Sequence, residues 1–269
     1  MRLSIQHQTR FDYAAPASYA LLQLRLHPRT GPTQEVLDWS LSLDGAVRHA
    51  TFRDAFGSHV DLIELSPDAR QVDIHVAGEV ETRAGSGIVG PGVVGSGASC
   101  VPLWHYRRET ALTRADADIS ALADAAAGAD RVAALHALSR DILAAVPYTS
   151  GTTRVGTTAA QALSGSAGVC QDHTHIFLSA ARRMGVPARY VSGYLMMNDR
   201  TDQEATHAWA EAHLDGLGWV GFDVSNGISP DERYVKIAHG LDYRDCAPTR
   251  GLIIGGSEEQ LEVTIQVQQ

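Results

Sequence analysis

Polar and apolar residues alternate with a period of two through most of the first 83 residues. The alternating segments are LSIQH (3–7), LLQLRLHP (21–28), VLDWSLSLDG (36–45), VDLIELS (60–66) and QVDIHVAGEVET (71–82). A period of two places successive side chains on opposite faces of a strand, so these segments predict an antiparallel β domain. Asp44 followed by Gly45 is typical of a hairpin turn.

A glycine-rich stretch follows the alternating segments. Between Gly85 and Gly97 the chain has six glycines and a proline, a composition that favours neither helix nor strand. We interpret this stretch as a loop, either a flexible link or a lid over a cleft. It also marks a domain boundary, which divides the chain into an N-terminal β-rich domain (1–97) and a second domain (98–269).

The hydrophobic period changes to that of a helix after Trp104. The segments DADISALADAAAG (116–128) and DRVAALHALSRDILAAVPY (130–148) predict two helices. Thr158 with Gln161 resembles a capping box that opens a short helix. A fourth helix is predicted from Cys170 to about residue 184, where Gly185 and Pro187 end it.

Strand-like alternation returns after this helix. It runs through ARYVSGYLM (188–196), THAWAEAHL (206–214) and GWVGFDVS (218–225), with a turn at Asp215-Gly216, and LEVTIQVQ (261–268) predicts a last strand. Helices followed by a hairpin-rich sheet make the second domain α+β. The predicted fold class of the whole chain is therefore α+β.

Composition and charge exclude several classes of protein. The 269 residues carry a net charge of -9, and the basic residues are dispersed, so we expect no nucleic-acid partner. No run approaches the roughly 20 apolar residues that span a bilayer, and the N-terminus lacks the apolar core of a signal peptide. The three cysteines, Cys100, Cys170 and Cys246, are too few and too far apart for a disulfide framework. We therefore expect a cytoplasmic protein with no membrane partner.

Cys170 is the strongest candidate for chemistry. A helix carries about half a positive charge at its N-terminus, which favours the thiolate of a cysteine placed there. Gly168 allows the backbone to approach a substrate closely, and the N–H groups of the first turn are free to bind an oxyanion. Acyl transfer also needs an imidazole beside the sulfur and a group that orients the imidazole.

His207 and Asp223 are the candidates for these two roles. His207 begins the strand HAWAEAHL, and Asp223 lies in the following strand. Each is about eight residues from the turn at Asp215-Gly216, so antiparallel pairing brings them nearly opposite each other. One helix start and one hairpin can thus assemble all three groups.

Simpler interpretations of the same residues remain open. Cys170 can be a buried small hydrophobe, as free cysteines often are, and we assign Cys100 and Cys246 that role. His173 and His175 after Cys170 suggest a metal site. Positions three and five after the cysteine do not share one helical face, and no second metal-binding motif follows, which disfavours this hypothesis. We expect no metal and no cofactor.

The sequence resembles the bacterial transglutaminase-like cysteine peptidase family, which has a papain-like core. GVCQDHTHIFLSAARRMGVPARYVSGYL (168–195) resembles its nucleophile helix, THAWAEAHL its histidine strand and GWVGFDVSNG its aspartate strand. Residues 24–44 and 54–65 resemble the β-rich N-terminal domain of the family. The segment ERYVKIAHGLDYRDCAPTRG (232–251) resembles its C-terminal part.

The resemblance implies a catalytic triad of Cys170, His207 and Asp223. Three positions depart from the family pattern: Val224 replaces a proline, His173 a phenylalanine, and Leu241 an arginine. None belongs to the triad. The implied activity is hydrolysis of an amide or peptide bond through an acyl thioester.

Three other activities stay as alternatives. They are transamidation, which crosslinks glutamine side chains, metal-dependent hydrolysis, and a non-catalytic peptide-binding module. The expected partner is a peptide or protein substrate, and the N-terminal domain can cap the cleft, bind substrate or form a homo-oligomer.

Overall fold

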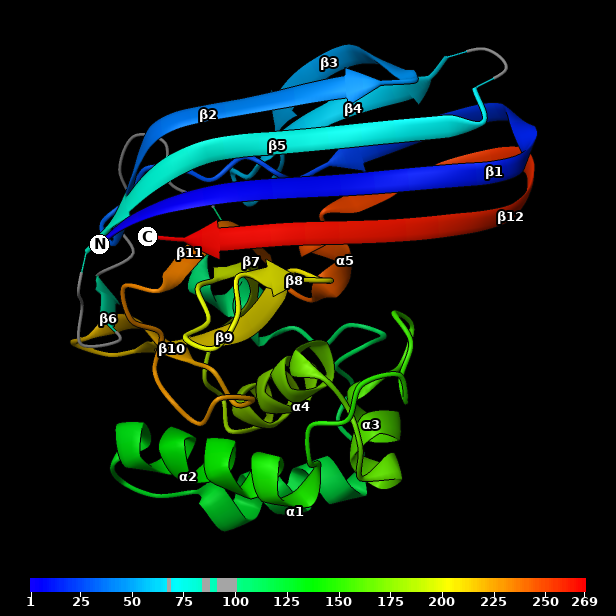
Figure 1. Ribbon diagram of the computed structural model, residues 1–269. Helices are drawn as coiled ribbons and strands as arrows, with labels where there is room; N and C mark the ends of the chain where they lie inside the picture. Colours follow the sequence, from blue (N-terminus) through cyan, green and yellow to red (C-terminus); the bar gives the residue numbers. More distant parts are fainter. Residues whose placement is uncertain (67–68, 84–87, 91–100) are drawn as a thin grey trace.

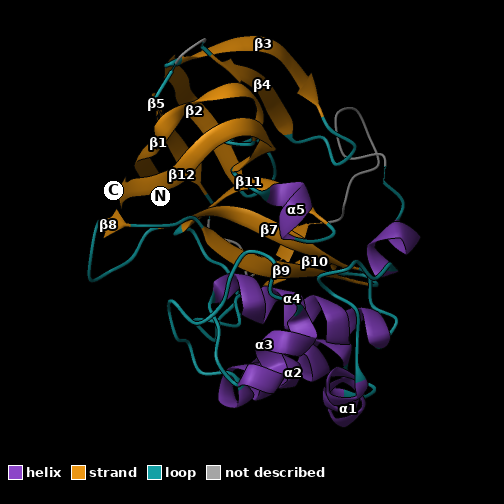
Figure 2. Ribbon diagram, turned by 90° about the vertical axis from the view of Figure 1, so that its right-hand side faces the viewer, coloured by secondary structure: helices purple, strands orange, loops and turns teal. Residues whose placement is uncertain are grey.

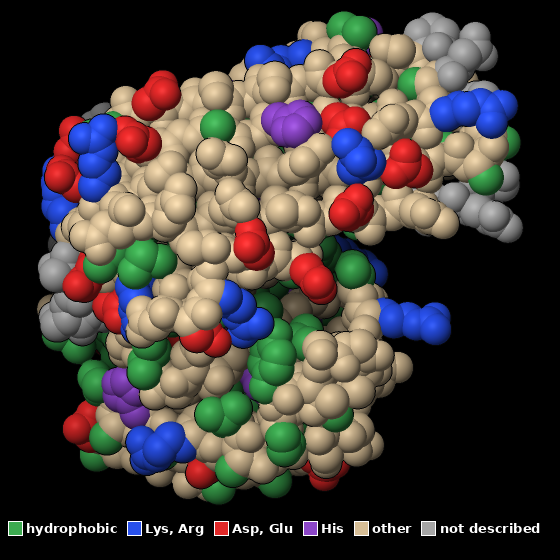
Figure 3. Space-filling view, in the orientation of Figure 1, with side chains coloured by type: hydrophobic (Ala, Val, Ile, Leu, Met, Phe, Trp, Pro, Cys, Tyr) green, Lys and Arg blue, Asp and Glu red, His purple; other side chains and the backbone are tan. Residues whose placement is uncertain are grey.

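The computed structural model of the chain describes residues 1–66, 69–83, 88–90 and 101–269. It has an upper lobe of long curved strands and a lower lobe of helices and shorter strands (Figure 1). A hollow separates the two lobes on the right-hand side of the view in Figure 3, whereas on the left, near both termini, they are in contact.

The described part of the upper lobe is an antiparallel sheet of seven strands. The strands are β1 (Arg2–Leu24), β2 (Gln34–Asp44), β3 (Ala46–Arg53), β4 (His59–Leu65), β5 (Gln71–Thr82), β8 (Asp202–Gln203) and β12 (Thr249–Gln268). They run in the order β2-β5-β1-β12-β8, and β4 pairs with both β1 and β3. The antiparallel β domain predicted from the alternating segments is present.

Strand β1 unites two segments that the sequence predicts as separate strands. Its first half pairs with β5, and residues Leu21 to Leu24 pair with β4. Its register against β12 shifts between Ala17 and Tyr19. Such an irregularity bends a strand and increases its twist, which lets one strand serve both halves of the sheet.

The hairpin predicted at Asp44-Gly45 is not formed. Strands β2 and β3 flank Gly45, but β2 pairs with β5 and β3 pairs with β4. Gly45 has φ +75°, and a Cβ atom there would lie 2.2 Å from the carbonyl oxygen of Gln71. The glycine therefore allows the chain to cross between two halves of the sheet. It does not close a hairpin.

The lower lobe has a five-stranded sheet with its longer helices on one face (Figure 2). In the described residues the strand order is β11 (Tyr234–Gly240), β7 (Ala188–Leu195), β9 (His207–Leu214), β10 (Gly218–Phe222) and β6 (Ile88–Gly90). The helices are η1 (Leu103–Arg107), α1 (Ala117–Ala126), α2 (Arg131–Ala145), α3 (Ala159–Gly165), α4 (Cys170–Arg183) and α5 (Tyr243–Cys246). The predicted α+β class is confirmed. In the part of the chain that is described, every helix is too short or too polar to cross a bilayer.

A domain boundary was predicted between residues 97 and 98, but two strands each pair with a strand from the other side of it. Strand β12, near the end of the chain, pairs along β1 in the upper sheet. Strand β6, from the glycine-rich stretch, pairs with β10 in the lower sheet, although no strand was expected there. Hydrogen bonding to a distant partner overrides the local composition at β6, and at β12 it decides which sheet a predicted strand joins. The rest of the glycine-rich stretch, interpreted as a link or lid, lies outside the described residues.

The two lobes share one hydrophobic core. Leu3 and Ile5 of β1 belong to the same buried cluster as Phe177 of α4 and Tyr194 of β7. Polar contacts support this packing: Nδ1 of His7 is 2.8 Å from the hydroxyl oxygen of Tyr194. The interface is therefore fixed by packed apolar side chains.

Acid is expected to destabilise the fold through His7. Burial lowers the pKa of His7 from 6.5 to about 4, so below about pH 6.5 the unfolded chain binds a proton that the folded chain excludes until about pH 4. The free energy of unfolding should fall by about 3 kcal/mol across this window because of this residue, and less in His7→Gln. Urea unfolding at pH 7 and pH 4.5 measures the difference. An equal pH dependence in both proteins would contradict the expectation, and His49→Gln, at an exposed position, is the control.

Candidate active site

Cys170 is the first residue of α4, as predicted. Its side chain is partly exposed, whereas nearly all the following residues of the helix are buried. A partly exposed sulfur at the N-terminus of a buried helix has access to solvent and feels the positive end of the helix dipole. The first-turn N–H groups, including that of Cys170, have no partner within the helix.

Asp172 holds the start of α4 in place. Its Oδ2 accepts hydrogen bonds from the backbone N–H of Val169, at 2.9 Å, and from the hydroxyl of Thr153, at 2.6 Å. A Cβ atom at Gly168 would lie 2.8 Å from the Cβ of Asp172, so the close approach requires glycine. The sequence analysis missed this role of Asp172. An acidic residue in the first turn, three positions after the capping residue, is the signal that identifies it.

His207 is the first residue of β9, and the structure brings it to Asp223. Its Nε2 donates a hydrogen bond of 2.6 Å to Oδ2 of Asp223. The ring stacks on Trp209, with centroids 6.2 Å apart and planes inclined by 26°. Within the hairpin Phe222 pairs with Ala210, so Asp223 follows directly after the paired residues of β10. The predicted hairpin therefore places the two side chains together.

Asp223 is fully buried and accepts several hydrogen bonds. Besides His207, its Oδ2 accepts from the amide of Asn226 and from the hydroxyl of Tyr234, both at 2.7 Å. Sequence reasoning missed both residues. Asn226-Gly227 is a turn signal that identifies the first, whereas no local pattern points to Tyr234, which comes from β11. These contacts fix the carboxylate against the imidazole.

The pKa shifts of His207 and Asp223 stabilise opposite charges on the two side chains. Burial alone would lower the pKa of His207, but hydrogen bonds with Asp223 and Cys170, together with their negative charges, raise it to about 10. Burial would likewise raise the pKa of Asp223, yet hydrogen bonds from His207, Asn226 and Tyr234 hold it below its usual value. Since Nε2 of His207 is bonded to Asp223, Nδ1 remains to face the sulfur. The shifts favour an imidazolium at His207 beside an ionised Asp223.

His173 and His175 do not converge with Cys170. His173 is buried between the carbonyl oxygen of Val146, 2.7 Å from Nε2, and the hydroxyl of Ser225, 2.8 Å from Nδ1. Nε2 of His175 accepts a hydrogen bond from the backbone N–H of Tyr243 at 3.2 Å. The described residues contain a convergent histidine-carboxylate group, but it lies in the upper lobe. The geometry therefore favours packing roles for both histidines.

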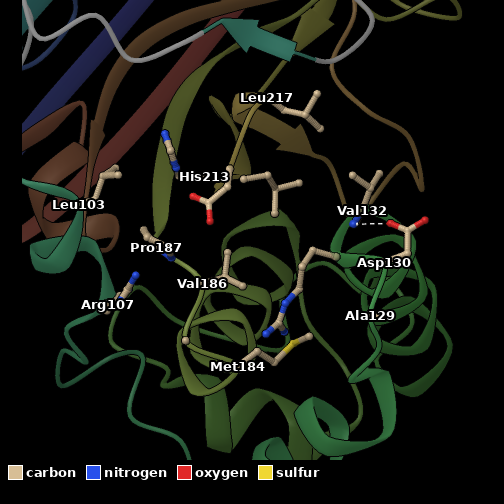
Figure 4. Close-up of a pocket in the computed structure, with 14 residues that line it drawn as sticks. Leu103, Arg107, Ala129, Asp130, Val132, Met184, Val186, Pro187, His213 and Leu217 are labelled. Atoms are coloured by element: carbon tan, nitrogen blue, oxygen red, sulfur yellow. Dashed lines mark hydrogen bonds between the residues drawn. The ribbon is translucent and has the colours of Figure 1, made fainter.

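A cavity of about 410 Å³ lies at the other end of α4 (Figure 4). Its lining includes Met184 and Val186, just after the helix, and His213 at the end of β9. A helix of 14 residues is about 21 Å long, so this cavity is remote from Cys170. It does not hold a substrate for the cysteine.

Two family models match the chain. A model of the transglutaminase-like superfamily matches residues 120–224, which contain Cys170, His207 and Asp223. A model of the bacterial transglutaminase-like N-terminal region matches residues 3–81, which cover β1 to β5 of the upper lobe. Together the two matches cover most of both lobes.

Two relatives and one solved structure are similar to this chain over nearly its whole length. An uncharacterized protein of Mycobacterium leprae is 28% identical over 99% of this chain and 98% of its own length. One of Mycobacterium tuberculosis H37Rv is 27% identical over 99% of this chain and 92% of its own. The crystal structure of a candidate cysteine protease from Cytophaga hutchinsonii superposes with a TM-score of 0.74. Its sequence is 19% identical to this chain, and the match covers 100% of this chain and 98% of the other. The similarity is therefore one of fold.

Proposed function

Since the chain belongs to the transglutaminase-like superfamily, we propose that it is a cysteine-dependent hydrolase of amide or peptide bonds. Cys170 is the nucleophile, His207 the acid and base, and Asp223 the group that orients His207. One observation carries the proposal: the ring of His207 joins a buried carboxylate to a cysteine at the start of a helix. This is the arrangement that activates a thiol for acyl transfer.

In the first half of the reaction the anionic sulfur of Cys170 attacks the carbonyl carbon of the substrate. The carbonyl oxygen becomes an oxyanion, and the backbone N–H of Cys170 stabilises it, a contribution of about 3 kcal/mol for one well-placed donor. The imidazolium of His207 then gives its proton to the leaving nitrogen. Ammonia or an amine departs, and an acyl thioester remains on Cys170.

In the second half His207, now neutral, accepts a proton from water. The resulting hydroxide attacks the thioester, the carboxylic acid leaves, and the anionic sulfur forms again beside the imidazolium. Asp223 keeps Nε2 of His207 protonated throughout, so that Nδ1 is the nitrogen that exchanges protons.

Glutamine peptides offered with and without a primary amine test the reaction type by mass spectrometry. We expect loss of ammonia with gain of water, or cleavage of a peptide bond, in both mixtures, because water reaches a partly exposed Cys170 directly. Incorporation of the amine in place of water would contradict hydrolysis in favour of transamidation. Absence of every product across a diverse peptide mixture would favour the non-catalytic module.

A cytoplasmic location and a peptide or protein substrate belong to the same proposal. The location rests on Cys170 and Cys246, which are both free thiols in the described part of the chain. A nucleophilic cysteine needs its reduced form, which the cytoplasm maintains. Cell fractionation with an antibody to the chain measures the location.

A further inference from the structure

Three side chains in the upper lobe converge on one point outside the candidate active site. They are His27, His59 and Asp61, and one potential ligand atom from each lies within 4.8 Å of the other two. His59 and Asp61 are two residues apart in β4, so both side chains project from the same face of the strand. Leu24, at the end of β1, pairs with Asp61, which brings His27, three residues later, to the same place.

The two separations that involve Asp61 are close to the spacing of ligand atoms in a tetrahedral metal centre. Oδ2 of Asp61 is 3.0 Å from Nε2 of His27 and 3.5 Å from Nε2 of His59. A zinc ion with bonds of 2.0 to 2.1 Å holds its tetrahedral ligand atoms about 3.3 Å apart. The two observed separations lie on either side of this value.

Two of the atoms that face the centre have no hydrogen bond within the described part of the chain. They are Nε2 of His27 and Oδ2 of Asp61, and both are buried. The two atoms lie 3.0 Å apart, which makes a charged pair only when His27 is protonated, and burial lowers the pKa of His27. The side chain of Asp61 is 1% exposed, and a buried carboxylate oxygen that faces neutral imidazoles without a hydrogen bond is costly. A cation bound between the three side chains removes that cost.

The second oxygen of Asp61 is held by the surrounding strand. Its Oδ1 accepts a hydrogen bond of 2.8 Å from the hydroxyl of Thr51 and lies 3.1 Å from Nε of Arg48. Contacts of this kind orient a ligating carboxylate and leave its other oxygen for the metal. The histidine side chains are 21% and 27% exposed, so the cluster lies near the surface of the lobe.

We propose that His27, His59 and Asp61 bind a divalent transition-metal ion of the zinc class. Two imidazoles and one carboxylate suit zinc, whereas calcium and magnesium prefer oxygen ligands alone. The ion cross-links the connection between β1 and β2 to β4. The sequence analysis expected no metal, because it tested only the histidines beside Cys170. The H-x-D pattern in β4 is the local signal of this site.

Zinc binding to metal-free full-length protein tests the proposal. All proteins carry Cys170→Ala, so that the thiol and His207 do not bind the ion, and any affinity tag is removed. Calorimetric titration with zinc chloride should give one ion per chain. His59→Ala and His27→Ala should each weaken binding at least tenfold, because each removes a ligand. Asp61 also contacts Thr51 and Arg48, so the histidine variants are cleaner.

His49→Ala is the matched control. His49 lies in the same lobe and contacts a carboxylate, Oε2 of Glu64 at 2.6 Å, but it is half exposed and outside the cluster. It should bind zinc like the parent. Zinc should also raise the melting temperature of the parent and of His49→Ala but not of His59→Ala, and the metal-free melts show whether each variant folds.

If the three side chains bind no metal, the experiments should give a different result. Zinc would then bind no tighter to the parent than to His59→Ala and His27→Ala, and would not change the melting temperature selectively. Either finding overturns the proposal. Substitution by cobalt adds an independent measurement, since a four-coordinate site gives an intense visible absorption that both histidine variants should lose. The proposed hydrolase activity does not depend on the outcome.

Discussion

Turnover by Cys170→Ala is expected to fall on the order of 10⁶-fold, because the variant has no atom that forms the acyl thioester. This loss corresponds to about 8 kcal/mol of transition-state stabilisation. The fold should remain intact, since the sulfur is partly exposed and alanine has the highest helix propensity. Single-turnover kinetics on a peptide hydrolysed by the wild-type protein, with a thermal melt of each protein, measure both effects.

Cys246→Ala is the control for this experiment. Cys246 is fully buried, and burial raises the pKa of its thiol well above the usual value, so it is not a nucleophile at neutral pH. Its substitution should lower stability through lost packing and leave the activity of the folded protein unchanged. Full activity of Cys170→Ala would end the proposal of a cysteine nucleophile.

Replacing Asp223 by Asn should lower kcat by roughly 10² to 10⁴-fold, because the amide no longer selects the protonated Nε2 of His207. The pH dependence should change as well. His207 must be protonated to accompany an anionic sulfur, so its raised pKa places the alkaline limb of kcat/KM near pH 10. Without the charge of Asp223, burial dominates, the pKa of His207 falls, and the limb moves to lower pH.

Two pH profiles measure this prediction. One follows kcat/KM, and the other follows the rate at which iodoacetamide alkylates Cys170, which reports on the sulfur without a substrate. Tyr234→Phe is the matched variant, because it removes one hydrogen bond from Asp223 and keeps the charge. Its profile should shift much less. An Asp223→Asn profile that coincides with the wild type would show that the carboxylate does not control His207.

His207 and Asp223 lose their contributions to the stability of the fold at opposite ends of the pH range. The contribution of His207, whose folded pKa is raised, is present below about pH 6.5 and is lost as the pH rises through about 10. The contribution of Asp223, whose folded pKa is lowered, is present above its usual pKa of 3.8 and is lost as the pH falls further. Between these limits the ion pair supports both the fold and the candidate site.

The sequence predicts the candidate site better than it predicts the sheets. The start of α4 at Cys170 and the hairpin that carries His207 depend on local signals, namely a glycine stop, a turn and alternating residues. The Thr158 capping box is also local and is observed. Strand pairing joins segments that are far apart in the sequence, and hydrophobic periodicity does not indicate which strands are neighbours. For this reason Gly45 was assigned to a hairpin, and β12 to the second domain.

Contacts that converge from several elements were missed for the same reason. Tyr234 reaches Asp223 from β11, and His27 reaches Asp61 from the connection after β1. Each pair depends on the folded arrangement of strands that are far apart along the chain. By contrast, Cys170 lies at a helix start and His207 and Asp223 lie in one hairpin, so local signals were enough to predict that they come together.

The pairing of β12 with β1 affects how the protein is assembled during synthesis. A ribosome releases the N-terminal strands first, but β1 lacks its long neighbour until residues 249–268 have been translated. Pairings of such large sequence separation form slowly, and the open edge of β1 is exposed to other chains in the meantime. Deleting β12 should therefore cause nascent chains to aggregate even though every residue of the candidate triad is still present.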